Sequence, residues 1–139
     1  YSAEGLRPAQ YLGVLGEKEI KEIYERSNIG VILYNAVGQY GGATAVKAYE
    51  YMAASMPIIM PDHGDWPAFN REIKCGLNVR VNDPESVARA VAWILENPEA
   101  AKQLGENGRE YVLRNYSWVS SLGRLKQLYD EILNYKASS

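Results

Sequence analysis

Apolar residues along the chain follow two patterns, short continuous runs and helical stripes. The continuous runs are residues 11–16, 29–34, 57–61 and 75–81, and their length and composition predict strands. After the first, second and fourth runs, apolar residues recur every three or four positions, which predicts amphipathic helices. Residues 62–73, after the third run, are expected to form a loop with one or two helical turns. Strands that alternate with helices and are apolar on both faces indicate an α/β fold with a doubly wound parallel sheet.

Several helix boundaries are marked by specific residues. The helix after the second run is expected to begin near Thr44, with a core stripe of Val46, Tyr49, Met52, Ala53 and Met56. Asp83 is the expected N-cap of a later helix, with Pro84 at its first position. The terminal helix, 117–136, should start at Ser117 and carry a stripe of Leu122, Leu125, Tyr129, Ile132 and Leu133.

Length and composition fit one compact domain over residues 1–139. The chain is 47% hydrophobic and 23% charged, which is typical of globular proteins and argues against disorder. The net charge is −2 and the basic residues are scattered, so no nucleic-acid partner is expected. No apolar run approaches the roughly 18 residues of a transmembrane segment, and no stretch resembles a signal peptide. The absence of an initiating Met predicts that the segment was cut from a longer protein.

Cys75 is the single cysteine, which excludes an internal disulfide framework and a metal site built from several cysteines. This is consistent with a reducing compartment. We interpret Cys75 as a small core residue rather than a nucleophile. Since no cluster of His, Asp and Glu has ligand spacing, the sequence gives no reason to expect a metal.

Ligands of open parallel sheets bind outside the carboxyl ends of the strands, so the loops after the strands are the candidate site. The loop before the helix near Thr44 contains Gly38, Gly41 and Gly42. These glycines allow close backbone approach to a helix N-terminus, which favours an anion such as phosphate. The alternative is that they only form a turn.

Glu50 follows about two turns after that helix start, some 9 to 12 Å along the axis, on the face opposite the core stripe. A carboxylate accepts hydrogen bonds only, so it suits a vicinal diol such as that of ribose while phosphate occupies the helix start. The alternative is a solvated ion pair between Lys47 and Glu50 at i,i+3 spacing.

His63 follows the run 57–61, so it also belongs to the predicted carboxyl edge. It is the only histidine and is expected either to donate to a phosphate or sugar hydroxyl or to be an ordinary surface residue. No nucleophile accompanies it, so the catalytic residues stay unknown. Trp66 is expected to anchor its loop in the core rather than to stack on a ligand.

With these residues in view, the chain resembles the carboxyl-terminal half of a glycosyltransferase with two Rossmann-like domains (GT-B), in the retaining family 4 or group 1. The most specific part is "KAYEYMAASMPIIMPDHGD", residues 47–65, and "DPESVARAVAWILENPEAAKQLGENGREYVLRNYSW" is a second match in order and spacing. The resemblance implies a truncated nucleotide-sugar-binding domain of a larger enzyme. It also implies that helix 117–136 crosses to the missing domain.

The resemblance assigns Glu50 to the ribose hydroxyls of the nucleotide and places Lys47 near the ligand. The family carries a second carboxylate eight positions earlier, where this chain has Gly42, and Ser55 replaces a usual glycine. Backbone N–H groups of Gly41, Gly42, Ala43 and Thr44, or Tyr40, are the expected substitutes for that contact. The basic residues that neutralise the diphosphate, the catalytic base position and the acceptor site of such enzymes lie outside this segment, so the segment alone should be inactive.

The leading hypothesis is therefore a fragment of a cytoplasmic enzyme, peripheral to the inner membrane in its intact form, that transfers a hexose-type sugar with retention. Its donor would be a nucleotide diphosphate sugar, its acceptor a glycan or lipid-linked glycan reached through the missing domain, and no cofactor is implied. A second hypothesis is a non-catalytic module of the same descent that binds a nucleotide sugar or a partner, for which Gly42 is the best support. A third is an epimerase or phosphorylase on the same scaffold.

Overall fold

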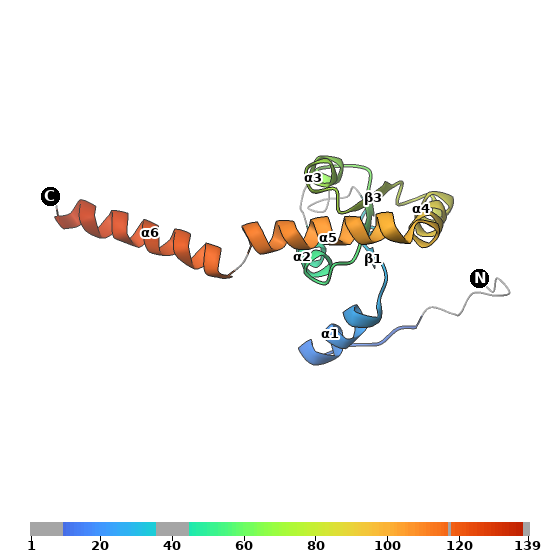
Figure 1. Cartoon of the computed structure of the whole chain (residues 1–139), viewed down its shortest axis with the longest axis horizontal. Coiled ribbons are helices and arrows are strands. Elements are labelled where there is room, and N and C mark those ends of the chain that lie inside the picture. The colour runs from blue at the N-terminus through green and yellow to red at the C-terminus, as the bar shows by residue number, and fades with distance from the viewer. Residues whose placement is uncertain (1–9, 36–44, 117, 138–139) are drawn as a thin grey trace.

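The structure is a computed structural model that describes residues 10–35, 45–116 and 118–137 (Figure 1). Its elements are α1 (Glu17–Arg26), β1 (Gly30–Val31), α2 (Val46–Ala53), β2 (Ile58–Pro61), α3 (Trp66–Ile73), β3 (Gly76–Val79), α4 (Pro84–Glu96), α5 (Pro98–Asn115) and α6 (Trp118–Ala137). The predicted alternation of strands and helices is confirmed between residues 17 and 96.

The three strands form a parallel sheet in the order β1-β2-β3. Ile58 of β2 is in register with Gly30 of β1 and with Gly76 of β3. One further bond, from the Ile32 N–H to the Ile59 carbonyl at 2.8 Å, extends the pairing beyond β1. Because the strands are parallel, the loops after all three emerge at one edge, as predicted.

The core lies on both faces of β2, whose four residues are all buried. Ile58 and Met60 pack on one face in a cluster with residues of α2 and α3, whereas Ile59 packs on the other face with residues of α4. This alternation follows from the opposite orientation of successive side chains in a strand. Helices therefore cover both faces of the central strand, which confirms the predicted arrangement there.

Two predictions about strands are wrong. Residues 11–16 form no strand, and the side chains of Tyr11 and Val14 are 92% and 100% exposed. An apolar run becomes a strand only beside a partner, and no described residue pairs with this one. The run 29–34 is fully covered on one face only, since Val31 and Leu33 are exposed while Ile32 is buried. On the other face, the cluster that includes α4 packs against Ile29 and Ile59 but not against Val31, which aligns with Ile59.

Helix α2 begins at Val46, two residues after the expected start, with Ala45 as its N-cap. Its buried residues are Ala48 and Met52, which lie one turn apart and face the sheet. The predicted stripe is therefore partly wrong. Met56 is buried, but Val46 and Ala53 are exposed.

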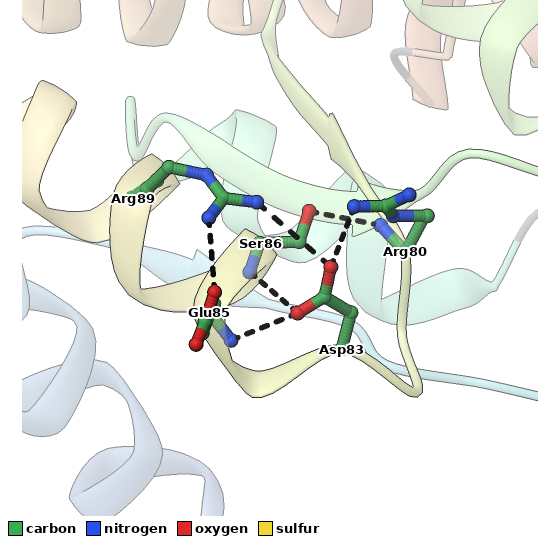
Figure 2. A network of polar contacts seen from close by, with 5 residues as sticks. All are labelled: Arg80, Asp83, Glu85, Ser86 and Arg89. Carbon is green, nitrogen blue, oxygen red and sulfur yellow. Dashed lines mark hydrogen bonds and ion pairs between the residues drawn. The ribbon is translucent and has the colours of Figure 1, made fainter.

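The N-terminus of α4 is capped as predicted. Asp83 Oδ1 accepts hydrogen bonds from the backbone N–H groups of Glu85 and Ser86, both at 3.1 Å. Figure 2 shows two arginines on the same carboxylate, Arg80 at 2.7 Å and Arg89 at 3.8 Å. The main cause that lowers the pKa of Asp83 is the hydrogen bond from the Ser86 N–H, and the positive charges of Arg80 and Arg89 lower this pKa further. Asp83 is therefore a charged cap at the carboxyl edge of β3.

A pair of asparagines joins α3 to the sheet. Asn70 Oδ1 accepts from the N–H groups of Cys75 and Gly76, and its Nδ2 donates to the Gly76 carbonyl. The same Nδ2 donates to Asn78 Oδ1, and Asn78 Nδ2 donates to the Pro61 carbonyl at 2.6 Å. This network satisfies backbone groups at the turn between α3 and β3.

Helix α5 approaches α2 closely through two glycines. A Cβ at Gly105 would lie 2.0 Å from the carbonyl oxygen of Ser55, and one at Gly108 would lie 2.8 Å from Met52 Cγ. Ser55 itself has φ of 58°, in the left-handed region that favours glycine. This conformation gives a physical reason for the glycine that the family usually has at this position.

Helix α6 extends away from the sheet and its covering helices (Figure 1). The predicted apolar stripe exists, but all of its residues are exposed: Leu122, Leu125, Tyr129, Ile132 and Leu133. Its expected cap, Ser117, lies outside the described residues.

Candidate functional site

His63 and Tyr34 meet at the carboxyl edge, where β1 and β2 end. His63 Nε2 donates to the Tyr34 carbonyl at 3.0 Å, which assigns the ring proton to Nε2. Nδ1 is then an acceptor, and it is buried without a hydrogen-bond partner among the described residues. His63 is thus partly buried at the predicted edge. Its Nε2 proton is already engaged, so the expected donation to a phosphate is not open to that atom.

Glu50 is exposed on α2, one turn after the helix start, about 6 Å along the axis at about 1.5 Å per residue. Its Oε2 accepts a hydrogen bond of 2.9 Å from the hydroxyl of Tyr24 on α1. The alternative ion pair with Lys47 is absent from the described part of the chain, where Lys47 is exposed. The partner of Glu50 is therefore 26 positions away rather than in its own helix.

Glu50 and Tyr24 line a cleft between α1 and α2 with a volume of about 710 Å³. Apolar walls come from Ile20, Ala53 and Ala54, and the charged lining residues are Glu17, Lys21, Glu25, Glu50 and Arg109. The guanidinium of Arg109 reaches the cleft from α5 and donates to the Ala53 carbonyl at the end of α2. A cleft of this size, apolar with a few polar groups, is typical of small-molecule sites.

Tyr24 is held on its other side by Tyr51 of α2. The two rings are 5.6 Å apart at 76°, an edge-to-face contact. Burial, and then the hydrogen bond to Glu50, raise the pKa of Tyr24 to about 12. Its hydroxyl therefore stays protonated at neutral pH and can keep donating.

Sequence reasoning missed Tyr24 and Arg109 as residues of this cleft. Tyr24 belongs to the apolar stripe of the helix over residues 17–26, and its hydroxyl is the one group in that stripe that could indicate a polar contact. Arg109 lies in a helix with many charges and had no distinguishing signal. Both depend on how α1 and α5 pack against α2.

The remaining predicted residues fall into two groups. Gly41, Gly42, Ala43 and Thr44 lie outside the described residues, so the anion site at the glycine-rich loop stays a prediction. Trp66 and Cys75 are core residues, as expected, with exposures of 2% and 0%. Burial raises the pKa of the Cys75 thiol to about 12, which suits a structural cysteine rather than a nucleophile.

Two features are absent from the described ranges. Within 10–35, 45–116 and 118–137, no three His, Cys, Asp or Glu residues are grouped so that they could hold a metal ion. None of the helices in those ranges has the length and apolar character needed to cross a membrane.

A parallel sheet with helices on both faces and polar groups at its carboxyl edge defines a Rossmann-like α/β domain. The family model of the glycosyl transferases group 1 matches residues 3–111, so the chain belongs to this family. This finding confirms the family resemblance carried by residues 47–65.

Curated relatives support the assignment. The chain is 28% identical to D-inositol 3-phosphate glycosyltransferase of Corynebacterium efficiens over 114 residues, 82% of this chain and 26% of that protein. It is 27% identical to spore coat protein SA of Bacillus subtilis over 115 residues, 82% of this chain and 29% of that protein.

A solved structure supports the fold. Sucrose-phosphate synthase from Thermosynechococcus elongatus, a GT-B enzyme, superposes with a TM-score of 0.73 and 27% identity over 94% of this chain and 31% of that chain. The predicted GT-B type of fold is thereby confirmed. The chain spans between about a quarter and a third of the length of these relatives.

Proposed function

We propose that the chain is the donor-binding domain of a retaining glycosyltransferase that moves a hexose-type sugar from a nucleotide diphosphate sugar. The observation that carries this proposal is the position of Glu50, an exposed carboxylate of α2 that lines the cleft against α1. Membership of the group 1 family supports the reaction class.

The chemistry of Glu50 suits a ribose diol. A carboxylate has about four lone-pair sites, and Tyr24 occupies one of them, so two hydroxyls of one sugar can still donate to it. Such charge-assisted hydrogen bonds are stronger than neutral ones. Lys47, exposed one turn earlier on α2, lies close enough to the helix start to face a charged part of the donor.

The diphosphate would lie towards the start of α2. The N-cap there is Ala45, which forms no side-chain cap, so the first N–H groups of the helix are free of a capping side chain. A helix N-terminus with such groups favours an anion. We infer that these N–H groups, with those of the loop residues Gly41 to Thr44, stabilise the departing diphosphate while Glu50 holds the nucleotide.

The edge residue His63 would border the donor without a hydrogen bond from its ring. Its Nε2 is directed at the Tyr34 carbonyl and its Nδ1 is buried, so neither nitrogen faces a sugar hydroxyl. No described residue is assigned as a catalytic base, and we expect no cofactor beyond the donor.

The intact enzyme would act in the cytoplasm or at the inner face of a membrane, in polysaccharide biosynthesis, with a glycan or lipid-linked acceptor. The acceptor site would lie in a second domain, contacted by helix 117–136. The present chain alone would then bind the donor without transferring the sugar.

The test is titration of the chain, and of the longer protein that carries it, with UDP and GDP. We expect Glu50→Ala to weaken binding of one nucleotide about tenfold or more, because it removes two hydrogen bonds to a charged acceptor. Glu99→Ala, an exposed residue in the first turn of α5, is the matched control and should leave both affinities unchanged. Equal affinities of Glu50→Ala and the unmodified chain would remove Glu50 from the site.

A second candidate function is donor binding without turnover. It is favoured by Gly42 at the position where the family carries its other carboxylate. Release of free nucleotide diphosphate from the donor by the longer protein, in the presence of acceptor glycans, would exclude this alternative.

A further inference from the structure

We infer that Tyr24 is a positioning residue, which holds the Glu50 carboxylate in the orientation that receives the ribose diol of the donor. This inference rests on the proposed function. It assigns a role to a residue of α1 that lies outside the motif of residues 47–65.

The contact itself is direct. The Tyr24 hydroxyl donates to Glu50 Oε2 at 2.9 Å, and both residues line the cleft. An exposed glutamate otherwise samples several rotamers, and a ligand that requires one of them must bear the cost of ordering the side chain. Because Tyr24 fixes one oxygen, the other oxygen and the remaining lone pairs are presented in a defined direction.

Tyr24 is itself well placed for this role, because its ring packs against Tyr51. The ring of Tyr51 occupies the space beside Gly30 of β1, where an added Cβ would lie 2.4 Å from Tyr51 Cδ2. A continuous row of contacts thus runs from the sheet at Gly30 through Tyr51 and Tyr24 to Glu50. The orientation of the Glu50 carboxylate therefore depends on contacts with the sheet as well as on its own helix.

The number of hydrogen bonds that the Glu50 carboxylate can accept decides whether Tyr24 positions it for the donor or blocks the donor. A diol needs two of the carboxylate's lone-pair sites, and Tyr24 uses one of about four, so Tyr24 and the donor can be bound together. Tyr24 also remains a donor at neutral pH, since burial and Glu50 raise its pKa to about 12. Loss of the hydroxyl should therefore weaken nucleotide binding rather than strengthen it.

The experiment compares Tyr24→Phe with Tyr111→Phe. Tyr24→Phe keeps the ring against Tyr51 and removes only the hydroxyl. Tyr111 is a matched control, because its hydroxyl also donates to a carboxylate of another helix, Glu72 at 3.2 Å, but away from the cleft. Affinities of the chain are measured by ligand-observed NMR for UDP and GDP and for their 2′-deoxy counterparts.

We expect Tyr24→Phe to weaken binding of the preferred ribonucleotide about three- to tenfold, the usual effect of one hydrogen bond. The 2′-deoxy nucleotide should lose much less, so discrimination between the two should fall. Tyr111→Phe should leave both affinities unchanged. In the background of Glu50→Ala, Tyr24→Phe should have no further effect.

Other outcomes would overturn the inference. If Glu50→Ala weakens binding and Tyr24→Phe does not, Tyr24 has no positioning role, and the proposed function stands. Equal losses for ribo- and deoxynucleotide would show a general structural effect, and tighter binding would show that Tyr24 blocks the site. If Glu50→Ala itself has no effect, or the unmodified chain binds neither nucleotide, the proposed function and this inference both fall.

Discussion

Asn70 and Asn78 are joined side chain to side chain, with Asn70 Nδ2 donating to Asn78 Oδ1 at 2.9 Å. Through this bond, and through four bonds to the backbone of neighbouring segments, the pair holds α3, β2 and β3 together. Amides in the interior are stabilising only when they are paired, so this contact is sensitive to truncation.

Asn70→Ala should lower the free energy of unfolding by about 2 to 4 kcal/mol, because the N–H groups of Cys75 and Gly76 lose their acceptor. Urea denaturation followed by circular dichroism measures the change. The control is Gln103→Ala, which breaks an amide pair on the exposed surface of α5 and should cost less than about 0.5 kcal/mol. Equal effects of the two variants would show that the partly buried network of Asn70 and Asn78 does not contribute.

The close approach of α5 to the turn after α2 predicts opposite effects at two helical glycines. Gly105→Ala should destabilise the fold by about 3 kcal/mol or more, because the new Cβ would lie 2.0 Å from the Ser55 carbonyl oxygen. Gly123→Ala in α6, where no described atom lies within 4 Å of the added Cβ, should raise helix stability by up to about 1 kcal/mol. Thermal unfolding of both variants measures the contrast, and a tolerated Gly105→Ala would contradict this packing of α5.

The left-handed conformation of Ser55 predicts that Ser55→Gly is not destabilising. A non-glycine residue at φ of 58° is disfavoured, so glycine should raise stability by up to about 1 kcal/mol. Ala54→Gly, one residue earlier with φ of −84°, is the control and should lower stability. Differential scanning calorimetry distinguishes the two signs, and a loss of stability in Ser55→Gly would argue against this turn geometry.

The charged cap of α4 predicts acid sensitivity. The pKa of Asp83 is lowered from 3.8 in the folded state, so its contribution to stability is present above pH 3.8 and is lost as the pH falls through the folded pKa. Asp83→Asn keeps a capping oxygen but removes the charge that faces Arg80 and Arg89. We expect the variant to be less stable at pH 7, with the difference shrinking below pH 3.8.

Asp130→Asn on α6 is the matched control for this prediction and should show no such convergence. Midpoints of urea unfolding at several pH values between 2 and 7 provide the measurement. A constant difference between Asp83→Asn and the unmodified chain over this range would mean that the ionised carboxylate contributes nothing.

Much of the fold could be predicted from local signals. The apolar residues of the run 57–61 are sufficient to predict the buried strand β2. Asp83 and Pro84 are likewise sufficient to predict the capped start of α4. Residues 11–16 carry an equally apolar run, yet Val14 is fully exposed. Hydrophobicity shows which residues would gain from burial, whereas a strand also needs a neighbour that its own sequence does not specify.

The candidate site shows the same division. The helix face of Glu50 could be predicted from periodicity, and its exposure agrees with that prediction. Its partner could not, because Lys47 at i,i+3 is the obvious local candidate, whereas Tyr24 reaches Glu50 only through the packing of α1 on α2. Spacing along one helix contains no information about such a contact.

The burial of Cys75 has a practical consequence. It is the sole cysteine of the chain. A Cβ added to Gly108 of α5 would lie 3.2 Å from the Cβ of Cys75, so α5 packs closely against this residue. A disulfide reagent in solution can therefore reach the sulfur only in molecules in which the helices packed around it have separated from the sheet. The rate of thiol labelling should report how often this separation occurs, with no introduced probe, and a chain found oxidised at this sulfur in a cell would be one that had already opened.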